Sequence, residues 1–271
     1  RAVVLQFDLQ IETFTRVIAI ERDPEGAFRV TLQKMFHHTP LGPTETLLAK
    51  RLILSTGGTE RPNLLSIPGE ELPTVSHYFQ DPHTYFEKKL LIVGGRNSAV
   101  EAALRCHRAG ATVHFSYRRE GVDPKDIKYW LYPEFSALTR AGHIHPHFQT
   151  QPVEIGPGFV TLASSVATDQ RQRLHIDFTL LMTGYEADMT LAKMAGVDLR
   201  GDQLLPLYNA DTMETNVPGL YVAGTAIAGT QRRYKVFLEN CHVHVARIVS
   251  HLTGRHAPPS EATPLYERPE S

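Results

Sequence analysis

The chain has 271 residues, 42% of them hydrophobic, and a formal net charge of −1 from 28 basic and 29 acidic side chains. This balance gives no field of one sign, so neither nucleic acid nor an anionic membrane is an expected partner. No apolar run reaches the roughly 18 residues of a bilayer span, and we expect no leader, since no charged-then-apolar segment opens the sequence. We expect a soluble, cytoplasmic protein of two domains that binds small ligands.

The cysteines give no sign of dithiol chemistry. Cys106 and Cys241 are far apart and form no C-x-x-C pair. The sequence therefore predicts neither a disulfide framework nor a dithiol redox motif. Because the chain opens with an arginine and almost at once enters a strand-like segment, we also expect that it lacks its own beginning.

Residues 17–58 have the pattern of short antiparallel strands. Apolar and polar residues alternate in RVIAIERD, AFRVTLQKM and AKRLILST, with a Gly/Pro loop expected at 41–43. This pattern predicts a three-stranded meander that ends in STGG at 55–58. Three prolines between 62 and 73 follow, so we expect a linker and a domain boundary within 75–88.

The next segment predicts one βαβ unit: a buried strand at 89–93, a helix at 98–109 closed by Gly110, and a strand at 111–117. The remaining elements are expected as a helix at 128–141, strands at 144–148, 159–163 and 178–182, a strand LYVAG that leads into a glycine turn, and a helix at 236–252. The tail, 256–271, is rich in Pro and Glu and is expected to be mobile.

The turn LLIVGGRNSAVEAA, residues 90–103, has the features of a dinucleotide site. Gly94 permits a tight bend from strand to helix, and the helix N-terminus favours a pyrophosphate. Arg96 replaces the second glycine of the G-x-G-x-x-G/A fingerprint, although Gly95 keeps some freedom and an arginine supplies charge. Ala99 takes the third place. A purely structural turn is the alternative, because one such motif is weak by itself.

The second strand of the βαβ unit ends in Tyr117-Arg118-Arg119. An enzyme specific for NAD carries an acidic residue near this point for the ribose hydroxyls, whereas two guanidinium groups suit a 2′-phosphate. The pair therefore favours NADPH. Taken alone, two arginines at a strand end are more often a solvated surface feature.

Two clusters have the composition of metal ligands: His143, His145 and His147, and Cys241, His242 and His244. No carboxylate at ligand spacing completes either cluster, and Pro146 suits a solvated edge strand. We therefore expect no metal site. The serines lack the G-x-S-x-G elbow, so a hydrolase nucleophile is not indicated.

Five motifs occur in one order: STGG at Ser55, GGRNSAVEAAL at Gly94, YRR at Tyr117, LMTGYEAD at Leu181 and VPGLYVAG at Val217. In this order the chain, over about residues 1–254, resembles the pyridine nucleotide-disulfide oxidoreductases of low-molecular-weight thioredoxin reductase layout. The resemblance implies an α/β fold of two Rossmann-like, three-layer ββα domains: an incomplete FAD-binding domain interrupted by an inserted NADPH-binding domain. The implied ranges are 1–84 for FAD, 85–187 for NADPH, 188–255 for the return of the FAD domain and 256–271 for the tail.

Within that group the chain resembles the bacillithiol disulfide reductase family. Members carry a basic residue at the place of Arg96, an IKYW segment, here at 127–130, and no aspartate at the place of Thr225. The C-x-x-C of thioredoxin reductases is absent from 77–82. The N-terminal FAD fingerprint, with its adjacent cysteine, is also absent from the sequence. No catalytic residue is therefore assigned.

The resemblance implies electron transfer from NADPH to FAD and on to a low-molecular-weight disulfide, in a possible homodimer. The implied cofactor residues are Gly94, Gly95, Arg96, Asn97, Ser98 and Glu101 at the pyrophosphate, Arg118 and Arg119 at the 2′-phosphate, Thr183 and Gly184 near the nicotinamide, and Thr56, Gly57, Gly224, Thr225, Glu239 and Asn240 along FAD. Cys241 is either a core residue or a thiol near the flavin. The alternatives are another NADPH-dependent flavin reductase, of ferredoxin–NADP reductase or monooxygenase type, and a non-catalytic NADP-binding fragment.

Overall fold

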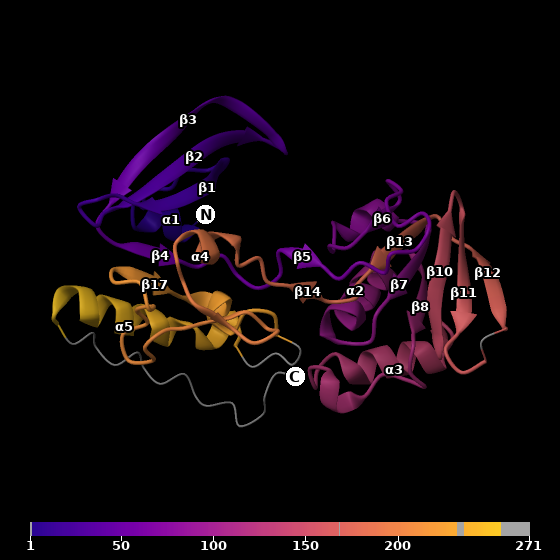
Figure 1. Cartoon of the computed structure of the whole chain (residues 1–271). Helices are drawn as coiled ribbons and strands as arrows, with labels where there is room; N and C mark the ends of the chain where they lie inside the picture. The colour runs from indigo at the N-terminus through magenta and orange to yellow at the C-terminus, as the bar shows by residue number, and fades with distance from the viewer. Residues whose placement is uncertain (1, 168, 232–235, 256–271) are drawn as a thin grey trace. The chain divides into compact units, whose positions relative to one another are not determined.

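The computed structural model describes residues 2–167, 169–231 and 236–255 and divides them into two compact units (Figure 1). Unit 1 contains residues 2–58, 187–231 and 236–255, and unit 2 contains residues 59–186 without 168. The resemblance implied a first boundary at 84/85. In the structure, 59–84 cluster with unit 2, in part because β6 (Val75–Ser76) pairs with β13 (Phe178–Leu181). The tail predicted to be mobile, 256–271, lies outside the described residues.

Unit 2 is built on a five-stranded parallel sheet of order β6-β13-β7-β8-β9. The predicted βαβ unit is confirmed as β7 (Lys89–Val93), α2 (Asn97–Arg108) and β8 (Thr112–Tyr117), and β9 is Ile144–Phe148. Strand β7 is buried on both faces because each face is covered, and Leu90, Leu91 and Ile92 are all 0% exposed.

Helices cover one face of this sheet and a second sheet covers the other (Figure 1). On the helical side, α2 and α3 (Tyr132–Arg140) pack against the sheet, and Phe135 lies against Phe115 with ring centroids 4.8 Å apart. The other layer is an antiparallel sheet of β10 (Thr150–Gly156), β11 (Phe159–Ser164) and β12 (Arg171–His175). The expected three-layer ββα architecture is thereby confirmed for unit 2.

Unit 1 opens with α1 (Ala2–Gln6) and an antiparallel meander of β1 (Thr15–Arg22), β2 (Phe28–Phe36) and β3 (Thr39–Ala49). The prediction that 49–56 form the third strand of the meander was wrong in its pairing, because only Ala49 belongs to β3. The expected loop at 41–43 lies inside β3, where the register shifts and the Gln33 side-chain amide donates to the carbonyls of Leu41 (2.9 Å) and Gly42 (3.2 Å). The strand therefore continues through a Gly-Pro bulge, where the sequence pattern predicted a loop between two strands.

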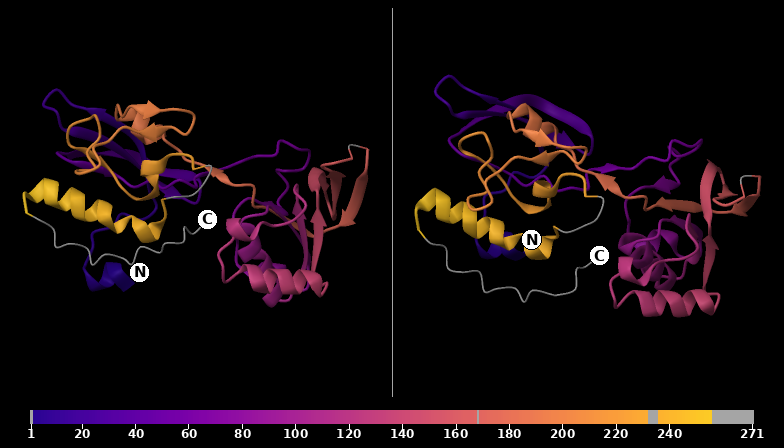
Figure 2. Two further views of the ribbon diagram at one scale, coloured as in Figure 1. Left: turned by 90° about the horizontal axis from the view of Figure 1, so that it is seen from below. Right: turned by 60° about the horizontal axis from the view of Figure 1, so that its bottom comes forward.

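The segment expected to complete the meander forms β4 (Leu52–Leu54), which pairs in parallel with β17 (Leu220–Val222). Behind this pair, Ile20, Phe28 and Val30 of the meander share a core with α4 (Thr190–Met194). The predicted last helix begins later, as α5 (His242–Thr253), after the 3₁₀ turn η4 (Leu238–Asn240) (Figure 2).

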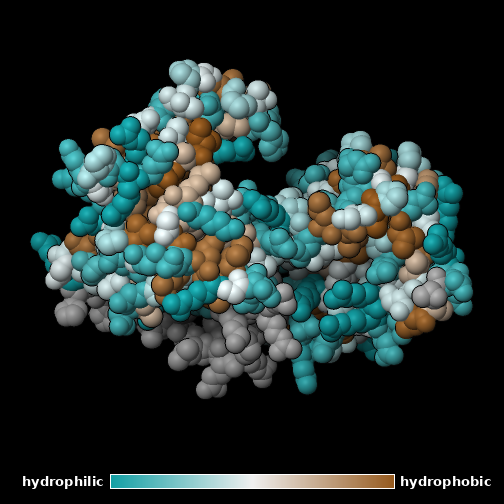
Figure 3. Space-filling view, in the orientation of Figure 1, coloured by the Kyte–Doolittle hydropathy of each residue, from teal (hydrophilic) through white to brown (hydrophobic). Residues whose placement is uncertain are grey.

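The remaining elements are short: β5 (Arg61–Pro62), η1 (Pro82–Tyr85), η2 (Pro124–Asp126), β14 (Tyr185–Glu186), β15 (Leu199–Arg200), β16 (Leu205–Pro206) and η3 (Gly224–Ala228). On the face shown in Figure 3, hydrophobic residues gather in small groups among hydrophilic ones on both units. Within the described ranges, no helix is long and apolar enough to cross a membrane.

Candidate functional site

The corner between β7 and α2 requires glycine at its first position. Gly94 follows β7 with φ +151°, and its N–H donates to the carbonyl of Ser116 at 3.0 Å. A Cβ on Gly94 would lie 2.6 Å from the carbonyl oxygen of Met182 and 2.9 Å from the Cβ of Ala99. Glycine therefore lets α2 begin in close contact with the segment that follows β13.

The next three residues set the first turn of α2. The ring of Tyr117 packs over Gly95, where a Cβ would lie 2.2 Å from ring atoms. Arg96 is the N-cap in extended conformation, and its side chain does not cap the helix. Asn97 Oδ1 accepts from the backbone N–H of Lys128 at 2.7 Å, so this side chain holds the loop before α3. The partial positive charge of the helix end still favours an anion at this turn.

The two predicted arginines lie at the same edge of the sheet as the corner. Strands β7 and β8 are parallel, with Val93 opposite Ser116, so their carboxyl ends are neighbours. Arg118 and Arg119 follow β8 directly, and both are exposed. Exposed guanidinium groups beside a helix N-terminus form an electropositive edge that is suited to phosphate groups.

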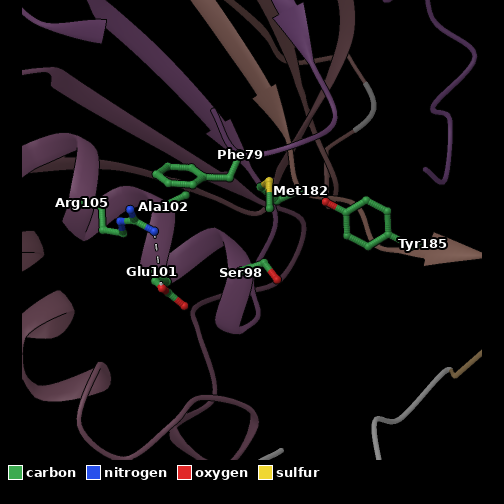
Figure 4. Close-up of a pocket in the computed structure, with 7 residues that line it drawn as sticks. All are labelled: Phe79, Ser98, Glu101, Ala102, Arg105, Met182 and Tyr185. Atoms are coloured by element: carbon green, nitrogen blue, oxygen red, sulfur yellow. Dashed lines mark ion pairs between the residues drawn. The ribbon is translucent and has the colours of Figure 1, made fainter. Parts of the chain in front are cut away.

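A pocket of about 260 Å³ adjoins the first turn of α2 (Figure 4). It is lined by Phe79, Ser98, Glu101, Ala102, Arg105, Met182 and Tyr185. Figure 4 shows the Arg105 side chain beside the Phe79 ring, with the guanidinium carbon 4.6 Å from the ring centroid, and paired with Glu101 at 3.9 Å. Ser98 connects the pocket to the corner. The volume suits one end of a dinucleotide rather than the whole molecule.

Sequence reasoning found Ser98 and Glu101 but missed the other five lining residues. Met182 and Tyr185 flank the predicted pair Thr183 and Gly184, so their place in the chain was the one available indication. Phe79 lies within 77–82, a segment that stood out in the sequence only because it lacks the C-x-x-C of thioredoxin reductases.

Thr183 and Gly184 hold the connection after β13 in place. The Thr183 hydroxyl donates to the carbonyl of Asn63 at 2.6 Å, and the Asn63 backbone N–H donates to the carbonyl of Gly184 at 3.0 Å. The following residue, Tyr185, donates its hydroxyl to the carbonyl of His77 at 2.9 Å and stacks on Tyr78 with ring centroids 5.3 Å apart. These bonds fix the lining of the pocket from the β13 side.

A second pair of predicted motifs meets in unit 1, at the carboxyl edge of β4 and β17. The strands are parallel and in register, and the Ala223 N–H donates to the carbonyl of Leu54 at 2.9 Å. Gly57, after β4, lies near Thr225, after β17: a Cβ on Gly57 would be 3.9 Å from Thr225 Oγ1. Thr56 is exposed beside it. Gly224 has φ +70°, and a Cβ there would stand in open space. This edge therefore has room beside its glycines.

The residues before α5 have structural roles. Asn240 Oδ1 accepts from the backbone N–H of Phe237 at 2.9 Å. The Cys241 thiol is buried and donates to the carbonyl of Phe237 at 2.8 Å. Glu239 belongs to η4, and its side chain lies outside what the structure describes.

His244, in the first turn of α5, was missed as a site residue. It is 5% exposed, and its Nδ1 accepts from the backbone N–H of Gly224 at 3.2 Å. Burial, then the charges of Arg247 and His242, lower the pKa of His244 below its usual value. The sequence showed this histidine only as part of a possible metal cluster.

Of the other predicted cluster, His147 is hydrogen-bonded to His114, a residue outside that cluster. His114 Nδ1 and His147 Nε2 are 3.0 Å apart, and the His145 ring lies 4.9 Å from that of His114, centroid to centroid. Among the described residues, no group of three or more His, Cys, Asp or Glu side chains is arranged to hold a metal ion.

Two units, each with glycine turns at the carboxyl edge of parallel strands, define a protein of the class with two dinucleotide-binding folds. The chain matches the family described as "Pyridine nucleotide-disulphide oxidoreductase" over residues 1–224. The chain belongs to this family of oxidoreductases. Proteins of this family and fold use FAD and a pyridine nucleotide.

Three proteins illustrate the similarity. "Bacilliredoxin reductase Bdr" of Bacillus subtilis (strain 168) is 37% identical over 213 residues, which are 78% of this chain and 64% of that protein. The solved "Bacillithiol Disulfide Reductase Bdr (YpdA)" from Bacillus cereus has a TM-score of 0.81 and 34% identity, covering 94% of this chain and 75% of that one. A "Ferredoxin--NADP reductase" of Ignicoccus hospitalis is 28% identical over 187 residues, 68% of this chain and 58% of that protein. This chain therefore spans about 64% of the length of the curated Bdr relative.

Proposed function

We propose that the protein to which this chain contributes is an FAD-dependent NADPH oxidoreductase that reduces a low-molecular-weight disulfide, with bacillithiol disulfide as its substrate. The single observation that carries the proposal is the presence of two glycine-lined edges in one chain, the β7–α2 corner and the β4–β17 edge. The names of the Bdr relative and of its solved counterpart support the choice of substrate.

The residues of unit 2 fit a phosphorylated pyridine nucleotide. In this proposal, the first turn of α2 binds the diphosphate through its amides and Ser98, and Arg118 and Arg119 bind the 2′-phosphate. The pocket beyond Ser98 would receive the nicotinamide end, where Met182, Tyr185 and Glu101 are among the lining residues. Thr183 and Gly184 act by holding that wall through Asn63.

The residues of unit 1 fit FAD at the β4–β17 edge. Nothing lies within 4 Å of a Cβ placed on Gly224, so a cofactor can approach the backbone there, and its left-handed backbone is one that glycine adopts without strain. Gly57 and Thr225 line the same edge from the two strands. In this proposal Thr56, Glu239 and Asn240 extend the lining, and Asn240 does so through the turn that it caps.

When bound, the two cofactors supply hydride transfer from nicotinamide to flavin, and the reduced flavin supplies the electrons that cleave the disulfide. The chain positions these groups and excludes water from them. Both described thiols, Cys106 and Cys241, are buried, and burial raises the pKa of Cys106 to about 12. We therefore assign neither to the disulfide step.

The test compares nucleotides and arginine variants. The wild-type chain is titrated with NADPH and NADH by calorimetry, beside the double variant R118A/R119A. We expect NADPH to bind at least about tenfold more tightly than NADH, and the double variant to lose that preference with little change for NADH, because one charge-assisted bidentate contact contributes roughly 1.5–3 kcal/mol. R171A, which removes an exposed arginine of β12, is the matched control. Equal binding of the two nucleotides by the wild type would contradict the proposal.

Flavin content and substrate are tested separately. A flavin absorbance band in the purified chain, and NADPH consumption that depends on bacillithiol disulfide, support the proposed activity. A colourless chain that binds NADPH supports the non-catalytic alternative. The similarity to a ferredoxin–NADP reductase favours a second candidate, in which the electrons pass to ferredoxin. Reduction of ferredoxin without reduction of the disulfide would select it. The homodimer stays an expectation from the resemblance, and the cytoplasmic location stays a prediction from the sequence.

A further inference from the structure

We infer that His244 is a positioning residue for the flavin site, which it serves by holding the Gly224–Thr225 turn through the amide of Gly224. The inference rests on the proposed function, in which this turn lines FAD.

The hydrogen bond between His244 and Gly224 joins helix α5 to the turn that follows β17. Gly224 opens η3 directly after the β17 edge, and His244 lies in the first turn of α5. The His244 Nδ1 accepts from the Gly224 N–H at 3.2 Å, and the histidine is 5% exposed, so water competes little for this bond. The bond fixes the direction of the first peptide of the turn, beside the open space at Gly224.

The bond requires one form of the imidazole. Nδ1 accepts a hydrogen bond only when the ring is neutral and carries its proton on Nε2. Burial of His244 and its cationic neighbours, Arg247 and His242, lower its pKa and so keep the ring neutral at physiological pH. The residue is therefore held in the state that the turn needs.

Docking of α5 does not depend on this bond alone. Two turns further along the helix, His251 Nδ1 and the Tyr221 hydroxyl lie 2.9 Å apart and connect α5 to β17. Ile248 is buried between them and packs with Tyr221 and Met213. Since these contacts anchor the helix, the specific role left to His244 is the placement of the turn.

The experiment uses three substitutions in the full chain. H244L removes the acceptor, and H244N restores an acceptor at the place of Nδ1. H251L removes the other hydrogen bond between α5 and β17 and serves as the matched control. FAD affinity is measured by flavin fluorescence quenching, NADPH affinity by calorimetry, and folding by far-UV circular dichroism.

We expect H244L to weaken FAD binding by at least about fivefold, because a buried amide is left without an acceptor. H244N and H251L should stay within about twofold of the wild type, and NADPH affinity should not change in any variant. If H244L does not fold, H244A supplies the variant without an acceptor.

Other results overturn the inference. If the wild type binds FAD and H244L binds it equally well, the inference fails and the proposed function stands. If H251L or H244N weakens binding as much as H244L, His244 has only a structural role. If the wild type binds no FAD, the proposed function fails and the inference falls with it.

Discussion

Substitution of Gly94 by alanine should destabilise unit 2 strongly. The backbone at this residue has φ +151°, a region that is costly for a residue with a side chain, by roughly 1–3 kcal/mol. The new Cβ would also lie 2.6 Å from the carbonyl oxygen of Met182 and 2.9 Å from the Cβ of Ala99. Both neighbours belong to the β13 connection and to α2, so relief requires movement of backbone, which costs roughly 1–3 kcal/mol more.

The expected loss is therefore about 2–6 kcal/mol, a large part of the roughly 5–15 kcal/mol by which a domain is stable. With a urea m-value of about 2 kcal/mol/M, the unfolding midpoint of unit 2 falls by roughly 1–3 M. Trp130, the one tryptophan of the sequence, lies in unit 2 and reports on its unfolding by fluorescence.

Gly121 provides the control within the same unit. Its backbone conformation is an ordinary one, and a Cβ there would meet nothing within 4 Å, so G121A should change stability by less than about 0.5 kcal/mol. A G94A midpoint within 0.3 M of the wild type, which is about 0.6 kcal/mol at that m-value, would refute the steric reasoning for the corner. Equal losses in both variants would refute it as well.

Three further outcomes are expected. F115A should cost about 3–5 kcal/mol in urea unfolding, because the ring is 0% exposed and packs on α3; a loss below 1 kcal/mol would show that the core collapses around the cavity. Cys106, whose pKa burial raises to about 12, should resist alkylation in the folded protein and react after denaturation, as followed by mass spectrometry. Burial, then His147, His145 and Lys89, lower the pKa of His114 from 6.5 to about 4, so the unfolded chain binds more protons between these values, and stability should fall as pH drops from about 6.5 towards 4. H114N should flatten that dependence, and an unchanged slope in thermal unfolding would contradict the assignment.

The sequence predicted the fold best where the pattern is local. The bounds of β7 were predicted to the residue, and those of α2 to within one, because a buried apolar run, a glycine corner and a periodic helix follow each other within a short segment. The bounds of β9 were also predicted to the residue. The edge strand β12 was missed because its RQRLH sequence is polar and exposed. Strand β10 was missed too, since Pro152 interrupts its pattern.

The sequence pattern does not indicate which distant segments pair with each other. Leu52–Leu54 read as the last strand of a meander, but its partner is Leu220–Val222, which a sequence without homologues gives no means of finding. The same limit applied to the site. Gly94 and Arg118 could be joined through one βαβ unit, whereas the bond from His244 to Gly224 depends on how α5 docks.

The bulge in β3 bears on the behaviour of this chain in concentrated solution. β3 is an edge strand, exposed along almost all of its length, and Leu41, Leu47 and Leu48 are among its exposed side chains. A long, regular edge of this kind invites intermolecular strand pairing and aggregation. Pro40 and Pro43 have no N–H that could donate to such a partner. Between them, the irregular backbone that the Gln33 side chain holds interrupts the ladder of hydrogen bonds. Replacement of Gln33 should therefore increase aggregation of the folded protein before it lowers the free energy of unfolding.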